Sequence, residues 1–271
     1  MLESYRIELL FSEPPQTEKL EEAVADNLEG VVDVQTVADG SLRLVEALEH
    51  EISPLPEWRL GPPVLRSPST LEPSLQQSWW WPEARAAAAA TTCSLPLFDA
   101  NNRTTNFRRR LEVCQRIAIA AIDALRPVAV EWIPSQQLLE PQQFAASVRE
   151  DGFGTPLPGG VNVRFFALEY DDAAGDQEYL MDTLGLGALG LADLQCHFRG
   201  LDPEEVSRTL YETACYQFDN GTILGDGDTV QGPRGDDRWK CVHGVSLAEP
   251  ERGVVDLDPG FPFSAGQTLE S

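Results

Sequence analysis

The stretch from Tyr179 to Val230 constrains the fold most, because strand, turn and helix signals follow one another there in a fixed order. Residues 177–184 predict a strand, and the glycine-rich run 185–190 predicts a tight connection into a further strand. The run 202–205, Asp-Pro-Glu-Glu, is a strong helix start, with an acidic N-cap and proline at the first helical position. The helix ends at Asn220-Gly221. Its buried stripe is predicted to comprise Val206, Leu210, Ala214 and Phe218.

The first fifty residues predict a strand, a helix and two further strands. Residues 5–11 alternate apolar and polar side chains, which is the period-two pattern of a half-buried strand. A helix follows Pro14-Pro15. Residues 31–37 and 42–48 predict two strands joined by a turn at Asp39-Gly40. This β-α-β-β order is typical of an α+β sandwich.

Proline and glycine punctuate the rest of the chain. Residues 53–73 contain six prolines and predict an extended connector or lid without regular structure. Pro96 interrupts the strand predicted at 91–98, which favours a place at the edge of a sheet or at the end of a strand. The residues after Glu249 predict a loosely held tail. Residues 151–160 are rich in glycine and proline, so we expect a subdomain boundary there.

The predicted fold class is α+β, with mixed, mainly antiparallel sheets and packed helices. We divide the chain into an N-terminal half, 1–150, and a C-terminal half, 151–271. We expect the two halves to pack together as one composite domain, and two related α/β subdomains are the alternative. The remaining elements are helices at 104–125 and 141–149 and strands at 128–133 and 161–170.

Composition indicates a reducing compartment. No stretch is long and apolar enough to span a bilayer, and the N-terminus lacks the basic and apolar regions of a secretory signal. The five cysteines are widely spaced and form no CxxC pair, which is typical of small core residues rather than of disulfides or a zinc site. We therefore expect a cytoplasmic protein without a bound metal or other cofactor.

The net charge of −24 is concentrated at the two ends of the chain. Residues 1–50 carry 12 acids against 3 bases, and residues 169–271 carry 21 against 6. Such a field repels nucleic acid and anionic membranes, and it speeds encounter with a cationic partner. The expected partner is therefore a basic protein. The alternative is that the charge serves only solubility.

Two short motifs in the C-terminal half resemble ligand-binding loops. Residues 185–190 match GxGxxG, but a dinucleotide site needs a long helix directly after the glycines, and Gly200 and Pro203 interrupt the following segment. Residues 225–228, Gly-Asp-Gly-Asp, resemble part of a calcium loop, but the further ligands and the terminal glutamate are missing. A tight strand connection for residues 185–190 and a hairpin turn with Asx hydrogen bonds for residues 225–228 are the better interpretations.

Asp182, Asp193 and His197 are candidates for a metal site or an acid/base site. Convergence of these three side chains in one cleft is the geometric condition for this hypothesis. Cys196 precedes His197, and adjacent residues of a strand face opposite sides of the sheet. These two residues therefore cannot join one site without a bulge.

Aromatic and basic runs in the N-terminal half have two interpretations each. Trp79, Trp80 and Trp81 cannot share one face of a helix or strand, so one of them is expected at a surface, where it could anchor a partner. The alternative is that they fill the core. The three arginines at 108–110 suggest a phosphate or RNA site, but consecutive side chains point in different directions. Internal ion pairs with carboxylates are the preferred interpretation.

The segments that carry a family resemblance are Gln77-Ser-Trp79 with Trp81-Pro82, Val130-Glu-Trp132, 136–141, 161–166, 182–186, 193–198 and 225–230. In this order they resemble a bacterial family known only as a domain of unknown function. The resemblance covers about residues 60–250 and establishes no catalytic residue. Members of that family resemble companions of secretion-system and polymorphic-toxin loci, which implies an immunity role.

The sequence therefore predicts a protein that acts by binding and is not an enzyme. The expected function is that of a cytoplasmic immunity protein that binds a cognate bacterial toxin and occludes its active site. A type VI secretion effector with nuclease activity is the expected toxin, and no cofactor, nucleic acid or membrane is expected as a partner. The alternatives are a metal-dependent hydrolase using Asp182, Asp193 and His197, or a non-catalytic adaptor. The candidate partner-binding residues are Asp171, Asp172, Asp176, Asp226, Asp228, Asp236, Asp237, Trp79, Trp80 and Trp81.

Overall fold

The computed structural model describes residues 5–16, 20–28, 30–46, 57–78, 80–100, 106–156, 158–168 and 177–265. The chain forms two compact units, Met1–Gly160 and Val161–Ser271. Each unit contains one mainly antiparallel sheet with helices packed against it, so the predicted α+β class is confirmed. The division falls at Gly160, at the end of the glycine- and proline-rich segment, rather than at residue 150. No helix within the described ranges combines the length and apolar character that crossing a bilayer requires.

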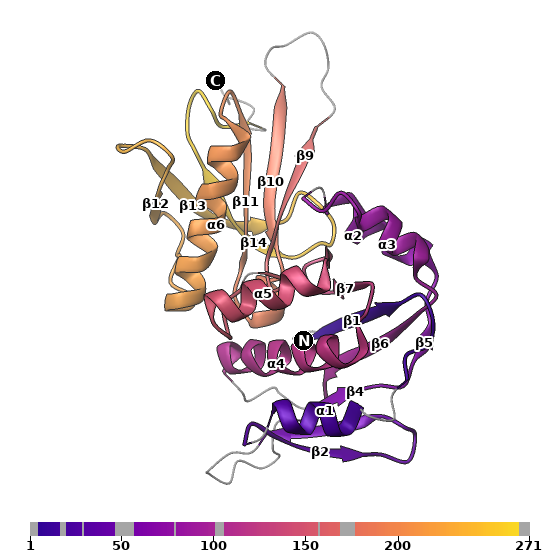
Figure 1. Ribbon diagram of the computed structural model, residues 1–271. Helices are drawn as coiled ribbons and strands as arrows, with labels where there is room; N and C mark the ends of the chain where they lie inside the picture. The colour runs from indigo at the N-terminus through magenta and orange to yellow at the C-terminus, as the bar shows by residue number, and fades with distance from the viewer. Residues whose placement is uncertain are drawn as a thin grey trace. The chain divides into compact units, whose positions relative to one another are not determined.

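The N-terminal unit is built on an eight-stranded sheet (Figure 1). Its order is β2-β3-β4-β6-β1-β7-β8, and β5 also pairs with β6. The strand predicted at residues 5–11 is confirmed as β1, but the prediction that it is half-buried is wrong, because it lies inside the sheet and is buried on both faces from Ile7 to Phe11. The strands are β1 (Arg6–Phe11), β2 (Val32–Thr36), β3 (Leu42–Glu46), β4 (Glu57–Leu60), β5 (Val64–Leu65), β6 (Cys93–Asp99), β7 (Ala129–Trp132) and β8 (Gln137–Leu139).

The long helix α4 (Phe107–Leu125) packs against α1 (Leu20–Asn27), α5 (Pro141–Asp151) and β6. Two of its arginines bind buried carboxylates at its first turns. Arg109 Nε donates to Glu46 at 3.0 Å, and Arg110 Nη2 donates to Asp99 at 2.6 Å. The predicted internal ion pairs of this basic run are therefore confirmed for these two residues.

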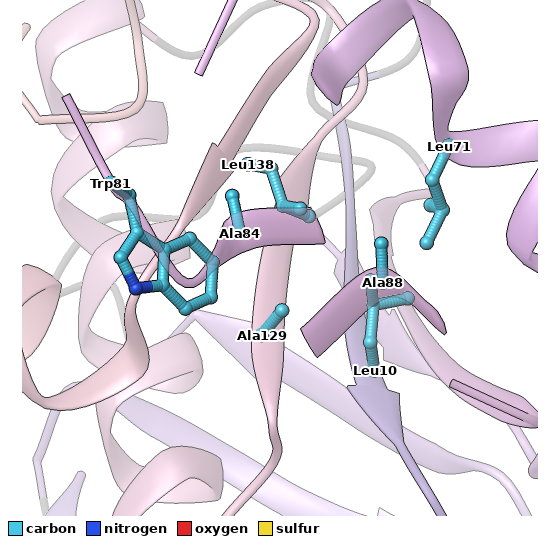
Figure 2. Close-up of a cluster of buried hydrophobic side chains, with 7 residues drawn as sticks. All are labelled: Leu10, Leu71, Trp81, Ala84, Ala88, Ala129 and Leu138. Atoms are coloured by element: carbon cyan, nitrogen blue, oxygen red, sulfur yellow. The ribbon is translucent and has the colours of Figure 1, made fainter. Parts of the chain in front are cut away.

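A second group of helices packs on the opposite face of the same sheet. It consists of the 3-10 helix η1 (Pro68–Leu71), α2 (Glu72–Gln76) and α3 (Ala84–Ala90). Figure 2 shows how side chains of η1 and α3, together with Trp81 just before α3, meet those of β1, β7 and β8 in one apolar cluster. The cluster comprises Leu10, Leu71, Trp81, Ala84, Ala88, Ala129 and Leu138.

The prediction that residues 53–73 lack regular structure is wrong from residue 57 onward. Strands β4 and β5, η1 and the start of α2 occupy this range, and Trp58 is fully buried. The prolines lie where a missing N–H is tolerated. Pro62 and Pro63 separate β4 from β5, and Pro68 and Pro73 lie in the first turns of η1 and α2.

The prediction that Pro96 lies near a sheet edge or a strand end is also wrong. Pro96 is the middle residue of β6, and β6 pairs with β1 on one side and with β4 and β5 on the other. Pro96 fits inside the sheet because the break between β4 and β5 lies beside it. Its carbonyl oxygen accepts the N–H of Gly61 at 2.8 Å, so the edge of Pro96 that lacks an N–H faces this break. A Cβ at Gly61 would lie 2.8 Å from Pro96 Cγ, so only glycine fits without a shift.

The C-terminal unit is a six-stranded sheet with the order β12-β13-β14-β11-β10-β9. Helix α6 (Pro203–Asn220) packs against β9, β10 and β11 and begins at the predicted N-cap, where Asp202 accepts the N–H of Glu204 at 2.9 Å. The predicted helix start is therefore confirmed. The strands are β9 (Asn162–Ala167), β10 (Glu178–Leu184), β11 (Asp193–Arg199), β12 (Thr229–Gln231), β13 (Arg238–Val245) and β14 (Gly253–Asp258).

The prediction of a loosely held tail after Glu249 is wrong for residues 253–265. Strand β14 lies inside the sheet, antiparallel to β13 and parallel to β11, and Leu257 is fully buried. The chain then returns to β11, where the N–H of Ala265 donates to the carbonyl of His197 at 3.1 Å.

The glycine-rich run after β10 forms a short connection. Residues Leu186–Leu189 form the 3-10 helix η2, flanked by Gly185 and Gly190 with φ angles of 124° and 82°. Residues that carry a side chain rarely adopt such φ angles, so the turn requires glycine at both positions. The predicted tight strand connection is confirmed.

Candidate functional site

A groove of about 600 Å³ lies in the C-terminal unit, between α6 and the chain that leads into β12. The volume falls within the range of roughly 300–1,000 Å³ that is usual for ligand sites. Both sides of the groove come from the same unit, so its geometry depends on one fold alone. It is lined by Thr209, Glu212, Thr213, Tyr216, Ile223, Leu224, Asp228, Thr229, Val230 and Gln231.

Helix α6 supplies one wall because its lining residues recur every three or four positions and therefore share a face. Thr209 and Thr213 are 5% and 7% exposed and form the deeper part of this wall. Glu212 is exposed, and Tyr216 is 54% exposed. The helix thus presents hydroxyl groups inside the groove and a carboxylate and an aromatic ring at its rim.

The opposite wall is shaped by a turn at Gly225–Asp228. Asp228 Oδ2 accepts the N–H of Gly225 at 2.8 Å, and the N–H of Asp228 donates to the carbonyl of Gly225 at 3.1 Å. The N–H of Cys241 holds the carbonyl of Asp228 at 2.8 Å. The predicted Asx hydrogen bond is present, but the prediction of a hairpin turn is wrong, because residues 225–228 lie between α6 and β12 rather than between two strands. The turn leaves Oδ1 of Asp228 without a hydrogen-bond partner among the described residues.

The groove combines negative charge with apolar surface. Glu212 forms no ion pair with any described residue, and no lysine or arginine belongs to the lining. Among the described residues, the side chain of Arg238 contacts the lining. Its Nη1 donates to Oε1 of Gln231 at 2.5 Å. Ile223 is 42% exposed beside Tyr216, so apolar area and carboxylates are available together. Such a surface complements a cation with an apolar stem.

The other acidic candidates of this region lie at both ends of β12. Asp226 precedes it, and Asp226 Oδ1 accepts the N–H of His243 at 2.6 Å. Asp236 and Asp237 lie in the loop between β12 and β13, where Asp237 Oδ2 is 3.4 Å from the N–H of Arg234. Asp226 and Asp236 are exposed, and Asp237 is half-buried. Asp171, Asp172, Asp176 and Trp79 lie outside the described residues.

The two described tryptophans of the candidate set belong to the core of the N-terminal unit. Trp81 is 9% exposed within the apolar cluster of Figure 2, and Trp80 is partly buried against the same cluster. A partner anchor must present its ring to solvent. The burial of these two residues therefore favours the alternative interpretation, core filling, for Trp80 and Trp81.

Asp182 and Asp193 meet in a buried network with two arginines. Arg164 Nε and Nη2 donate to the two carboxylate oxygens of Asp182 at 2.8 and 2.6 Å. Arg252 Nη2 donates to Asp182 Oδ2 at 2.7 Å, and its Nε donates to Asp193 Oδ2 at 3.1 Å. Asp182 is fully buried and Arg164 is 3% exposed. The sequence pattern identified the two aspartates but not the arginines, since Arg164 and Arg252 lie far from them in the chain.

This network fastens the loop before β14 to the sheet. Arg164 Nη1 donates to the carbonyl of Glu249 at 2.8 Å, and Arg252 Nη1 donates to that of Pro250 at 2.9 Å. Burial raises the pKa of Asp193, although Arg252 favours its charged form. Because both carboxylates are bound by guanidinium groups, the arrangement acts as a structural clamp.

The third residue of the proposed hydrolase set lies apart from the first two. His197 Nε2 is 3.1 Å from a carboxylate oxygen of Glu178, and Gln195 separates His197 from Asp193 along β11. Cys196 points to the other face of the sheet and is fully buried there, as adjacent strand residues require. Among the described residues no group of three or more His, Cys, Asp or Glu side chains has the arrangement of a metal site.

Residues 182–258 match the model of a family described as a domain of unknown function, DUF4261. The matched range contains the groove and three of the four residues of the buried network. The predicted resemblance to an uncharacterised domain family is therefore confirmed over this range. No curated protein and no solved structure matches the chain.

Proposed function

We propose that this chain is a cytoplasmic immunity protein that binds a cognate bacterial toxin and occludes its active site. The observation that supports a binding role is the groove between α6 and β12, where Glu212 and Asp228 lie beside exposed Tyr216 and Ile223. A basic protein surface is the partner that such a lining fits, because it offers cations and apolar stems together. A type VI secretion effector with nuclease activity is the proposed toxin.

The proposed mechanism has an electrostatic step and a packing step. The net charge of −24 speeds the encounter with a basic toxin, and this contribution weakens as salt screens it. Apolar contacts in the groove then supply the buried area that holds the complex. The toxin loses activity because the bound protein covers the basic cleft with which it recognises an anionic substrate.

Growth rescue tests this proposal. Cells producing the toxin encoded beside this gene should survive when the wild-type protein is present, and the two proteins should purify together. A groove double variant, Glu212→Gln with Asp228→Asn, removes two charges and keeps both side-chain shapes. The control double variant, Glu204→Gln with Glu150→Gln, removes two exposed charges elsewhere.

We expect the control double variant to rescue growth like the wild type and the groove double variant to rescue poorly. Death of the cells despite the wild-type protein, together with the lack of a complex, would contradict the immunity function. Equal rescue by the two double variants would place the binding surface outside the groove.

A further inference from the structure

We infer that the groove receives an arginine side chain carried by a loop of the bound protein. The inference rests on the proposed function, because that function makes a protein the source of the cation. It adds the chemistry of the contact, namely that a guanidinium group binds between Glu212 and Asp228 and stacks on Tyr216.

The two carboxylates of the groove, Asp228 and Glu212, can each accept hydrogen bonds from an incoming donor. Asp228 Oδ2 accepts the N–H of Gly225, which leaves Oδ1 available to an incoming donor. Glu212 has no ion pair with a described residue and lies on the opposite wall. Two acceptors on facing walls suit a donor that is planar and forked. A guanidinium group has five N–H donors in such a geometry, whereas an ammonium group is a compact point charge.

The aromatic and apolar lining of the groove suits the flat head group and the aliphatic stem of an arginine. Tyr216 lies one turn after Glu212 on the same face of α6 and exposes 54% of its surface. A guanidinium group over a tyrosine ring gains a cation–π contact while its edge remains free for carboxylates. Leu224 and Val230 can pack on the aliphatic stem of the same side chain.

The hydroxyl group of Thr209 offers a further acceptor on the wall formed by α6. Thr209 Oγ1 donates its proton to the carbonyl of Glu205 at 3.0 Å, so its remaining capacity is that of an acceptor. Arginine donates hydrogen bonds and accepts none, and it can therefore satisfy this wall together with the carboxylates. An anionic side chain would be repelled by Glu212 and Asp228. A neutral apolar side chain would bury these carboxylates without replacing their water.

The direct test is a titration of the full-length protein with three capped tripeptides, N-acetyl-Gly-X-Gly-amide, in which X is arginine, lysine or citrulline. Citrulline has the shape of arginine and no charge. Chemical shifts in nuclear magnetic resonance spectra of Tyr216, Thr213 and Ile223 report binding in the groove. We expect the arginine peptide to shift these signals, the lysine peptide to bind about fivefold more weakly, and the citrulline peptide to leave them unchanged.

Variants make the test specific. Asp228→Asn and Tyr216→Leu should each weaken the arginine peptide, and Glu204→Gln, which removes an exposed charge at the start of α6, should not. Unchanged circular dichroism spectra would show that the variants fold. Equal binding of the three peptides, binding outside the groove, or no binding at all would overturn the inference.

The titration uses no toxin, so it separates the two proposals. Arginine binding without growth rescue would remove the immunity function and keep the guanidinium site. Growth rescue without arginine binding would keep the immunity function and remove the guanidinium site.

Discussion

Single carboxylates in the C-terminal unit differ sharply in their surroundings. Asp182 is fully buried and binds two guanidinium groups. Asp228 is exposed, and one of its carboxylate oxygens accepts a hydrogen bond from Gly225 in the same turn. Asp256 is partly buried, its Oδ1 has no hydrogen-bond partner among the described residues, and burial raises its pKa to about 6. Because charge, burial and partners vary independently, each residue makes a separate contribution to stability or to binding.

Replacing Asp182 by asparagine should destabilise the C-terminal unit strongly. The change removes the charge of a fully buried carboxylate that binds both Arg164 and Arg252, and breaking a buried pair costs about 3–5 kcal/mol. The control is Asp123→Asn, which breaks the exposed pair of Asp123 with Arg149 and should cost less than about 1 kcal/mol. Urea unfolding followed by circular dichroism measures both. Equal, small losses in the two variants would show that the network contributes little.

Asp256 should make stability depend on pH. Its folded pKa of about 6 lies above the ordinary value of 3.8, so the folded state keeps a proton that the unfolded state loses between these values. Its contribution to stability is therefore favourable below about pH 4 and is lost as the pH rises towards 6. Asp256→Asn should be more stable than the wild type at pH 7, and the difference should shrink at pH 4.5. A difference in unfolding free energy that is the same at both values would contradict this assignment.

At the scale of elements, the N-terminal sheet depends on the fit of β6 between β1 and the pair β4 and β5. Gly61→Ala should destabilise the N-terminal unit by about 1–3 kcal/mol, because the added Cβ would lie 2.8 Å from the rigid ring of Pro96. Gly244→Ala is the control, since its Cβ would meet no atom within 4 Å. Thermal unfolding of the two variants compares them directly. A tolerated Gly61→Ala would mean that the break between β4 and β5 can move.

Elements that are determined by neighbouring residues could be predicted from the sequence. Elements that depend on pairing with residues far away in the chain could not. Helix α6 carries its own N-cap and stripe between Asp202 and Asn220, so its bounds follow from neighbouring residues. Strand β14 follows Pro250 and pairs in parallel with β11, which is distant in the chain. Its burial therefore could not be predicted from neighbouring residues. The groove depends on how residues 223–231 return along α6. The exposed Tyr216, outside the predicted stripe, is the sequence signal that could have indicated it.

At the scale of the whole molecule, charge and local shape have separate roles in the proposed binding. The charge of −24 is a long-range property of the chain and affects mainly the rate of encounter. The groove is a short-range property of the C-terminal unit and affects how long the complex lasts. Added salt should therefore slow association more than it speeds dissociation.

Isothermal titration calorimetry of the purified protein with the toxin encoded beside its gene is the sharpest test of whether the groove binds that toxin. We expect binding by the wild type and by the control double variant. The affinity of the groove double variant should be roughly 10 to 100 times lower, since hydrogen bonds to charged groups contribute about 1.5–3 kcal/mol. Absence of binding by the wild type would contradict the immunity function, and equal affinities of the two double variants would contradict binding through the groove.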